Sequence, residues 1–273
     1  MNATAVPPHY DAVVVGAGFG GMYMLHNLRK HGFSARVFEA GSDVGGTWYW
    51  NRYPGARVDI ESMQYSYSFS EELDQEWQWT EKYAPQPEIL KYAQHVADRF
   101  DLRRDIQFNT RVTSAHFDEQ AKRWTITTDQ GDEVTAQFCI MAVGCLSAAN
   151  KPPFEGLDDF AGPIYHTGEW PHEGVDFTGK RVAVIGTGSS GIQSIPVIAE
   201  QASQLYVFQR TPNYTVPAWN SPVDPEWEAE VKADYPAMRA KARARPTGFY
   251  FDFNTKPALE ASEEERRQTY DCL

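Results

Sequence analysis

The chain has 273 residues, of which 42% are apolar and 23% are charged, and its formal net charge is −12. This length can bury a sizeable core and would ordinarily hold two domains, and the composition is globular. The acidic balance disfavours nucleic acid and anionic membranes as partners, and no apolar run approaches the roughly 18 residues that cross a bilayer. The first residues lack a basic segment, so we expect no signal peptide and a cytoplasmic location. The three cysteines (Cys139, Cys145 and Cys272) have no metal-ligand or disulfide-framework spacing, so we expect no metal site.

The first nucleotide-binding signature follows a short apolar run at 11–15, which predicts a buried parallel strand. The next residues fit the pattern G-x-G-x-x-G, and a helix that stops at Gly32 and a strand at 35–38 should follow. Glycines permit the tight turn and the close approach of a pyrophosphate, and an acid after the second strand accepts hydrogen bonds from ribose hydroxyls. The signature predicts a dinucleotide site with these residues: Gly16, Gly18, Phe19, Gly20, Gly21 and Glu39.

An aromatic-rich segment covers 44–69 and reads VGGTWYWNRYPGARVDIESMQYSYSF. Gly45 and Gly46 permit close approach of the backbone, and the aromatic side chains offer large flat surfaces. For any one of these aromatic residues taken alone, a place in the hydrophobic core is the better interpretation. Asp59 has an ordinary interpretation as a turn or helix-cap carboxylate.

The region 88–144 predicts an amphipathic helix followed by a β-meander. The helix is expected over 88–100. Strands are expected over 106–117, 124–128 and 133–137, with a turn at 129–132 before the last of them. A further apolar strand is expected over 138–144. Together with the two strands of the first signature, these elements predict a sheet with two parallel strands and a meander.

A second signature repeats the first one. An apolar strand at 182–185 precedes a glycine loop, a helix that contains Pro196, and a strand at 205–208. When the halves are aligned, VFEA of the first matches VFQR of the second, so Gln209 and then Arg210 stand where Glu39 and Ala40 stand. A carboxylate accepts from a free 2′-hydroxyl, whereas a guanidinium favours a 2′-phosphate, so the first loop should hold FAD and the second NADP(H). Arg210 as a plain surface charge is the alternative. The candidate residues of the second site are Gly186, Thr187, Gly188, Ser189, Ser190, Gly191, Gln193, Arg210 and Thr211.

The last part of the chain is predicted to be helical. A helix is expected over 224–245 with an interruption at Pro236, and Ser262 begins a capping box for a further helix. The basic residues Arg239, Lys241, Arg243 and Arg245 have the pattern of a solvated face rather than of a phosphate site.

The connector between the two signatures reads FAGPIYHTGEWP over 160–171. An ordinary linker with one hydrogen-bonded histidine and one anchoring tryptophan is one interpretation. Its pattern F-x-G-x-x-x-H-x-x-x-W-P, however, resembles the fingerprint of Baeyer–Villiger monooxygenases, flavoenzymes that insert oxygen beside a ketone carbonyl. The matching positions are Phe160, Gly162, His166, Trp170 and Pro171. The segment GGTWYWNRYPG resembles the run that wraps the flavin in the same family, and the residues that this resemblance assigns to FAD are Gly46, Thr47, Trp48, Asp59 and Tyr65. The family resemblance also implies that Val112 lies by the adenine of FAD through its backbone.

The resemblance implies an α/β protein with two Rossmann-like domains, both incomplete, at 1–146 and 147–223, and the truncated start of a helical subdomain at 224–273. It also implies that NADPH reduces FAD, that O2 adds at flavin C4a, and that this peroxyflavin converts a ketone to an ester or lactone. In the family, an aspartate that matches Asp59 holds a catalytic arginine, which would lie beyond residue 273. The chain resembles only the N-terminal half of such an enzyme, so a C-terminal half, in the form of a second chain, is a candidate partner. The alternatives are an N- or S-oxidising flavin monooxygenase, a disulfide reductase, and a non-catalytic fragment.

Overall fold

The computed structural model describes residues 7–213, 215, 218–250 and 256–271. The chain divides into two compact units, each made of two segments. The first unit comprises Met1–Ala56 and Gln86–Phe208, and the second comprises Arg57–Pro85 and Gln209–Leu273. The mixed α/β architecture confirms the predicted fold class. The three-domain division at 146 and 223 stays a prediction.

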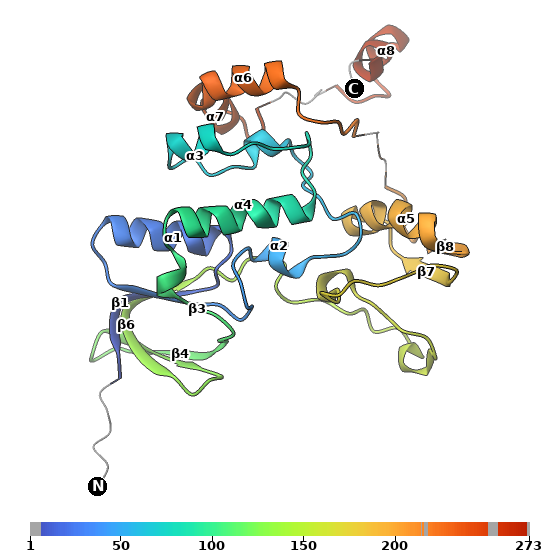
Figure 1. Ribbon diagram of the computed structural model, residues 1–273. Coiled ribbons are helices and arrows are strands. Elements are labelled where there is room, and N and C mark those ends of the chain that lie inside the picture. The colour runs from blue at the N-terminus through green and yellow to red at the C-terminus, as the bar shows by residue number, and fades with distance from the viewer. Residues whose placement is uncertain (1–6, 214, 216–217, 251–255, 272–273) are drawn as a thin grey trace. The chain divides into compact units, whose positions relative to one another are not determined.

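The first unit contains a six-stranded sheet with the order β3-β2-β1-β6-β5-β4. The strands β3, β2, β1 and β6 run parallel, and β5 and β4 extend the sheet antiparallel from β6. Figure 1 shows α1 and α4 lying on the same side of this sheet. The bounds are His9–Val15 for β1, Phe19–Lys30 for α1, Ala35–Phe38 for β2, Gln86–Arg99 for α4, Ile106–Gln107 for β3, Val112–Asp118 for β4, Arg123–Thr128 for β5 and Glu133–Met141 for β6.

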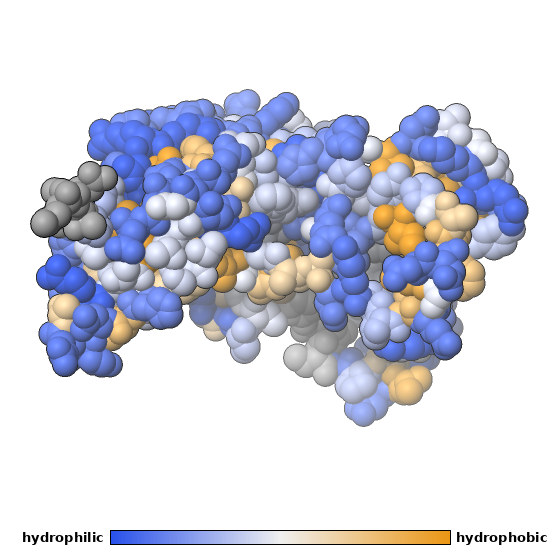
Figure 2. All heavy atoms as spheres, turned by 90° about the horizontal axis from the view of Figure 1, so that it is seen from below, coloured by the Kyte–Doolittle hydropathy of each residue, from blue (hydrophilic) through white to orange (hydrophobic). Residues whose placement is uncertain are grey.

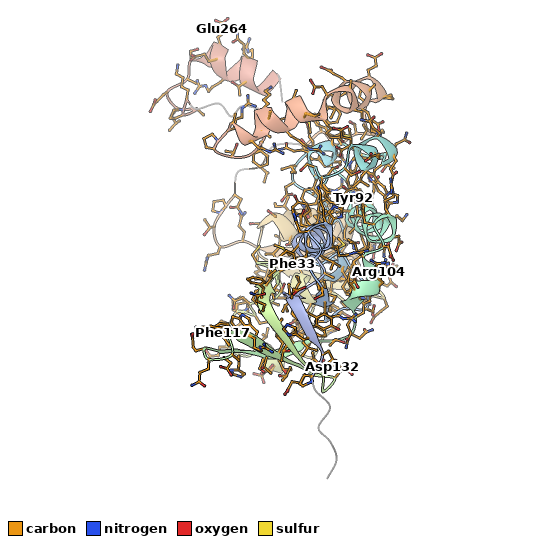
Figure 3. All side chains as sticks on the ribbon, turned by 90° about the vertical axis from the view of Figure 1, so that its left-hand side faces the viewer. Phe33, Tyr92, Arg104, Phe117, Asp132 and Glu264 are labelled. Carbon is orange, nitrogen blue, oxygen red and sulfur yellow. The ribbon has the colours of Figure 1, made fainter. Side chains whose placement is uncertain are left out.

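The central strand β1 is buried because it has neighbours on both edges and helices above it. Val13 is fully buried and packs with Phe38 and with residues of the meander. The ring of Tyr92 on α4, labelled in Figure 3, is buried and lies 6.1 Å from that of Phe19 at the start of α1. Figure 3 also shows Phe117 and Asp132 on the meander, and Phe117 is partly exposed there.

Two strand predictions were wrong. The expected strands 133–137 and 138–144 form one strand, β6, which pairs with β5 over 133–136 and with β1 over 135–141. The expected strand 106–117 is divided into β3 and β4, because the backbone turns at Asn109 with a φ of +52°. The sheet therefore has more parallel strands than the two that we predicted.

The second nucleotide signature forms a smaller sheet in the same unit. Strands β7 (Arg181–Ile185) and β8 (Gln204–Phe208) pair in parallel, and α5 (Ser189–Gln201) connects them. Among the described residues, the second half thus forms the two strands that were predicted for it. Short helices occur earlier in the unit at α2 (Thr47–Trp50) and in the connector at η3 (Leu157–Asp159) and η4 (Thr167–Glu169), and η2 (Arg103–Asp105) precedes β3.

The second unit is helical. The helix expected over 224–245 is interrupted before Pro236, where Asp234 ends α6 and accepts a hydrogen bond from Ala237 N in the first turn of α7. Ser262 and Glu265 form the predicted capping box, in which each side chain accepts from the other residue's backbone N–H. The helices are η1 (Ser62–Gln64), α3 (Glu71–Glu76), α6 (Pro225–Ala233), α7 (Tyr235–Arg243) and α8 (Glu263–Asp271).

The prediction of a solvated basic face on α7 was wrong for Arg239. Its guanidinium binds both carboxylate oxygens of Asp74, at 2.6 and 2.7 Å, and donates to Tyr67 O at 2.8 Å. The Asp74 side chain is only 4% exposed. Arg239 therefore joins α7 to the segment around α3 rather than facing solvent.

Candidate functional site

The first glycine loop has the backbone that a dinucleotide site requires. Gly16 has a φ of +102°, and its N–H donates to Phe38 O at 2.8 Å. A Cβ on Gly21 would lie 1.9 Å from Gly16 O, so only glycine allows the helix to start this close to the strand. Gly18 occupies the N-cap position of α1 and supplies no side-chain cap. The N–H groups of the first turn are thus left to an anionic ligand such as a pyrophosphate.

Glu39 lies at the end of β2 and is buried. Its carboxylate accepts from the backbone N–H of Ala17 at 2.6 Å and of Gly41 at 2.7 Å. A carboxylate has about four lone-pair positions, so two backbone donors leave capacity for ribose hydroxyls. The backbone donors also orient Glu39 beside the loop, and its role toward ribose stays a prediction.

The second loop repeats this geometry within the same unit. Gly186 has a φ of +101° and donates to Phe208 O at 2.9 Å, and a Cβ on Gly191 would lie 2.4 Å from Gly186 O. Gly188 caps α5 with dihedrals of −74° and −176°, against −75° and −172° for Gly18. The two loops are therefore built alike, and both fit the phosphates of a dinucleotide. Thr187, Ser189 and Ser190 lie on this second loop and the first turn of α5.

The two loops differ in what lies beside the first glycine. A Cβ on Gly16 would lie 2.7 Å from Ala142 O, just after β6, whereas a Cβ on Gly186 would meet no described atom within 4 Å. The strand β6 that flanks β1 therefore has no counterpart beside β7 among the described residues. Side chains of this small sheet are exposed accordingly, with Ile185 at 64% and Phe208 at 57%. Figure 2 shows apolar side chains at the surface on its right-hand side, the part of the chain that carries β7 and β8 in Figure 1.

The start of the aromatic segment packs on the first loop. Gly45 N donates to Ala17 O at 3.1 Å, and a Cβ on Gly46 would lie 2.7 Å from the Cα of Gly18. Thr47 then begins α2, and the carbonyl of the buried Trp48 accepts from the Gln86 side chain. The structure thus brings Gly46 to the first glycine loop, and Thr47 and Trp48 follow it directly, whereas their roles toward FAD stay predictions.

The connector is anchored by Trp170, which is 7% exposed and packs with Phe177 and Ile198 under β7 and β8. His166 caps η4 through its Nδ1, which accepts from Gly168 N at 3.1 Å. Phe160 is 63% exposed, and its ring lies where a Cβ on Gly162 would be. The hydrogen-bonded histidine and anchoring tryptophan of the ordinary-linker interpretation are both present. Pro171 continues the chain directly after the anchor.

The structure adds contacts between the connector and the aromatic segment. His172, directly after Pro171, lies edge-on to the ring of Tyr49 at 5.1 Å, and the Arg52 guanidinium lies 5.0 Å from the same ring. Burial and the neighbouring Arg52 lower the pKa of His172. Sequence reasoning missed this residue, because its partner Tyr49 lies far away in the sequence. Gln193 on α5 makes a further link, because its Oε1 accepts from Tyr53 at 2.9 Å.

The remaining predicted residues are distributed between the units. Val112 begins β4 in the first unit, where it packs at the edge of the sheet core. Asp59, Tyr65, Arg210 and Thr211 belong to the second unit. Asp59 is exposed in a bend, whereas Glu61 holds the N-cap position of the next helix, so Asp59 is no cap of η1. Arg210 is exposed, and within the described part of the chain its guanidinium forms no ion pair. The cofactor roles of these residues stay predictions.

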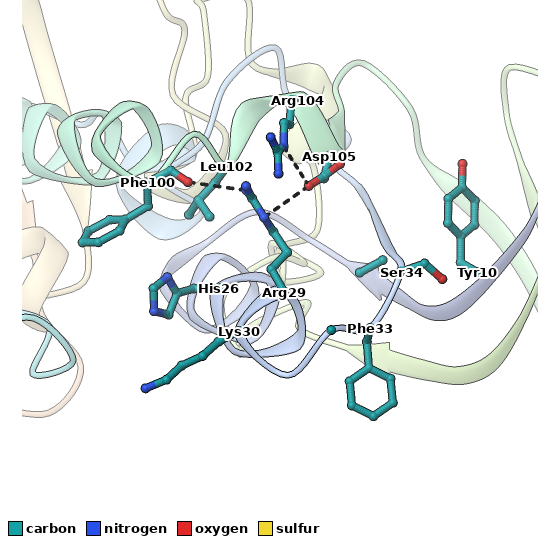
Figure 4. Close-up of a pocket in the computed structure, with 12 residues that line it drawn as sticks. Tyr10, His26, Arg29, Lys30, Phe33, Ser34, Phe100, Leu102, Arg104 and Asp105 are labelled. Carbon is teal, nitrogen blue, oxygen red and sulfur yellow. Dashed lines mark hydrogen bonds and ion pairs between the residues drawn. The ribbon is translucent and has the colours of Figure 1, made fainter.

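A groove of about 730 Å³ lies elsewhere on the first unit, beside the C-terminal end of α1 and the first residues of β1 and β2 (Figure 4). These are the opposite ends of the strands from the glycine loop. Arg29 is paired with Asp101 and Asp105, and Arg104 is paired with the same two aspartates. These two arginines are therefore neutralised by carboxylates, which makes the groove less attractive to a phosphate.

The described cysteines give no support to a disulfide reductase. Cys139 is half-buried within β6, where burial raises the pKa of its thiol, and Cys145 is exposed after the strand. A thiol with a raised pKa is a poor nucleophile. Cys272 lies outside the described residues. Within the described residues, no helix combines the length and hydrophobicity that a membrane span requires.

Comparison with known proteins agrees with this geometry. The family described as "Pyridine nucleotide-disulphide oxidoreductase" matches residues 13–242. A Baeyer-Villiger monooxygenase of Pseudooceanicola batsensis is 48% identical over 272 residues, which are 99% of this chain and 50% of that protein. The phenazine N-monooxygenase PhzNO1 of Lysobacter antibioticus is 45% identical, over 96% of this chain and 49% of that protein. A solved structure of an oxidized steroid monooxygenase bound to NADP is 63% identical with a TM-score of 0.89, and the match covers 97% of this chain and 51% of that one.

The chain spans about half the length of the curated relatives that it matches. The family match includes both glycine loops and the connector. The chain therefore belongs to the pyridine nucleotide-disulphide oxidoreductase family, and its predicted resemblance to one half of the Baeyer–Villiger monooxygenases is confirmed.

Proposed function

We propose that this chain is the dinucleotide-binding half of an FAD- and NADPH-dependent Baeyer–Villiger monooxygenase, which uses O2 to convert ketones to esters or lactones. The observation that carries the proposal is a pair of glycine loops with matching backbone geometry but opposite chemistry after the second strand. Glu39 follows β2, whereas Gln209 and Arg210 follow β8. The solved relative bound to NADP supports the nicotinamide assignment.

The first loop, Glu39 and the start of the aromatic segment would hold FAD. Gly16, Gly18 and Gly21 allow the pyrophosphate to reach the N-terminus of α1, and Glu39 accepts from ribose. Gly46, which precedes α2, lies against Gly18, so the flavin ring would extend toward α2. The flavin, when bound and reduced, supplies the chemistry of oxygen activation. The protein residues bind it, orient it and exclude water.

The second loop would hold NADPH with the same helix-terminus geometry. Arg210 presents an exposed positive charge two residues after β8, where a 2′-phosphate is distinguished from a 2′-hydroxyl. Asp59 would not bind the phosphates of FAD or of NADPH. Its exposed carboxylate is suited to hold a cation supplied from outside this chain, and the resemblance assigns that cation as an arginine.

A C-terminal polypeptide, joined to this chain or separate from it, is the partner that we propose. The chain covers 50% of its 48%-identical relative. The edge of β7 that no described strand flanks, with the exposed side chains of Ile185 and Phe208, offers a place for such a partner. Burial of exposed apolar side chains would drive the association. A ketone and O2 are the proposed small-molecule partners.

N-oxidation of an aromatic nitrogen is the second candidate activity. It is favoured by one observation, the 45% identity with a phenazine N-monooxygenase over 96% of this chain. The shared half binds nucleotides in both cases, so the chemical outcome would be decided largely by residues outside this chain.

The test joins this chain to the C-terminal half of the Pseudooceanicola batsensis relative and supplies FAD, NADPH, O2 and either cyclohexanone or phenazine. Lactone formation supports the proposal, and exclusive formation of an N-oxide favours the second candidate. Asp59→Ala should leave the flavin bound and NADPH consumption active, but divert the product to hydrogen peroxide. The matched control Glu119→Ala removes an exposed carboxylate of the meander and should leave lactone yield unchanged. Normal lactone yield in Asp59→Ala would remove that residue from the site.

A further inference from the structure

The bend that carries Asp59 is attached on both sides to residues 80–85 of the second unit. Before the bend, Val58 N donates to Ala84 O at 3.1 Å, and after it Ser62 N donates to Lys82 O at 2.7 Å. The Ser62 hydroxyl is buried and bonds three backbone groups of the same segment. Only three residues, 59–61, lie between these two attachment points. The position of the bend therefore depends on the position of residues 80–85.

Residues 80–85 are in turn attached to a segment far along the chain, 220–223. Lys82 N donates to Ser221 O at 2.9 Å, and Val223 N donates to Thr80 O at 3.1 Å. Tyr83 N donates to the side-chain oxygen of Asn220 at 3.0 Å. The three segments thus form a ladder, with the middle segment hydrogen-bonded on both sides.

One side chain crosses the whole ladder. The Oε2 of Glu81 accepts from the Arg57 guanidinium at 3.3 Å on one outer segment and from the Asn220 amide on the other. Glu81 and Arg57 are each about one-third exposed, at 35% and 34%. Arg57 lies two residues before Asp59. A carboxylate is well suited to this position because one oxygen can accept from two donors.

We propose that Glu81 is a positioning residue for Asp59: it ties the three segments together and thereby holds the Asp59 carboxylate where it can receive a cation. The proposal rests on the proposed function for the role of Asp59, but the ladder itself is independent of that role. Glu81 touches neither Asp59 nor the reacting atoms, so it acts only through the backbone of residues 57–62. Removing it should loosen the bend without changing the nucleotide loops of the other unit.

The first measurement is hydrogen–deuterium exchange of the full chain, followed at the amides of Val58 and Ser62. In Glu81→Ala, exchange at both amides should be roughly 5-fold faster than in the wild type, whereas amides of β1 and β6 should be unchanged. Glu81→Gln should restore most of the protection, because its amide oxygen still accepts from both donors. Glu119→Ala is the control for loss of a carboxylate. If Val58 and Ser62 exchange in Glu81→Ala as slowly as in the wild type, the proposal is overturned. If Glu81→Ala does not fold, Glu81→Gln decides: protection of the two amides equal to that of the wild type supports the proposal, and loss of amide protection throughout both units overturns it.

The second measurement uses the joined enzyme described above. Glu81→Ala should raise the fraction of NADPH consumed as hydrogen peroxide several-fold with an unchanged KM for NADPH, and Glu81→Gln should lie near the wild type. Unchanged coupling in a variant whose bend exchanges faster overturns the positioning role. If the wild-type enzyme forms no lactone at all, the proposed function fails, whereas the exchange result still decides whether Glu81 holds the bend.

Discussion

The glycines of the first loop offer a test of geometry at the scale of one residue. A Cβ on Gly21 would lie 1.9 Å from Gly16 O, whereas a Cβ on Gly20 would meet no described atom within 4 Å. Gly21→Ala must shift the backbone and should lower the free energy of unfolding by about 1–3 kcal/mol or more, with loss of FAD. Gly20→Ala is the matched control and should be neutral or stabilising by about 0.5 kcal/mol. Urea denaturation and bound flavin absorbance measure both effects, and equal stability of the two variants would show that the loop is not packed as described.

Nicotinamide choice is a second question at this scale, and it depends on Arg210. Loss of a charge-assisted contact to a 2′-phosphate costs about 1.5–3 kcal/mol, which is roughly 10- to 100-fold in affinity. Arg210→Ala in the joined enzyme should therefore erase most of the preference for NADPH over NADH. The ratio of the two kcat/KM values measures this, and Arg243→Ala on α7 is a control that removes an arginine elsewhere in the unit. An unchanged ratio in Arg210→Ala would show that Arg210 is a surface charge with no role in nucleotide choice.

At the scale of elements, the ion pair between Arg239 on α7 and Asp74 on α3 should hold the second unit together. The pair is bidentate and its side chains are 15% and 4% exposed, so removal of one partner leaves a buried charge. Arg239→Ala should cost about 3–5 kcal/mol, whereas Arg267→Ala, which breaks a pair with Glu263 at 72% and 84% exposure, should cost less than about 1 kcal/mol. Urea denaturation of the two variants, monitored by hydrogen exchange at the amides of α7, measures both losses of stability. Similar losses in both variants would mean that the Arg239 pair is solvent-screened.

The helices and strands also differ in how well they could be predicted from the sequence. The strands of both signatures were predicted within two residues, because apolar runs and glycines define them locally. The continuous strand β6 was divided, because only its first residues pair with the meander strand β5 while β1 pairs with it from residue 135 to its end, and no local pattern reveals where one partner stops. The role of Arg239 was missed for the same reason, since Asp74 lies far away in sequence.

In the candidate site, too, local motifs were predictable and contacts between distant segments were not. Glycines, Glu39 and the connector were recognisable because short motifs carry their chemistry. The contact of His172 with Tyr49, and the ladder through Glu81, bring together segments that are distant in sequence, and no spacing could indicate them.

At the scale of the whole molecule, the exposed apolar surface of the β7–β8 sheet makes a prediction about association. Ile185 is 64% exposed beside a strand edge with no described neighbour, and such edges pair with other chains. The isolated chain should therefore self-associate and bind FAD weakly, and adding the C-terminal half of the Pseudooceanicola batsensis relative in trans should restore a defined complex and flavin binding together.

A charged residue at the edge of β7 tests both self-association of the isolated chain and its binding to the C-terminal half. Ile185→Lys should reduce self-association of the isolated chain in light scattering, because charged side chains oppose edge pairing. The same change should weaken binding of the C-terminal half at least tenfold, whereas Phe117→Lys, at a residue 41% exposed on the meander, should affect neither measurement. A wild-type chain that is monomeric, melts cooperatively, binds FAD tightly and converts a ketone with NADPH unaided would contradict the prediction. In that case the β7 edge would need no partner, and the activity would lie within these 273 residues.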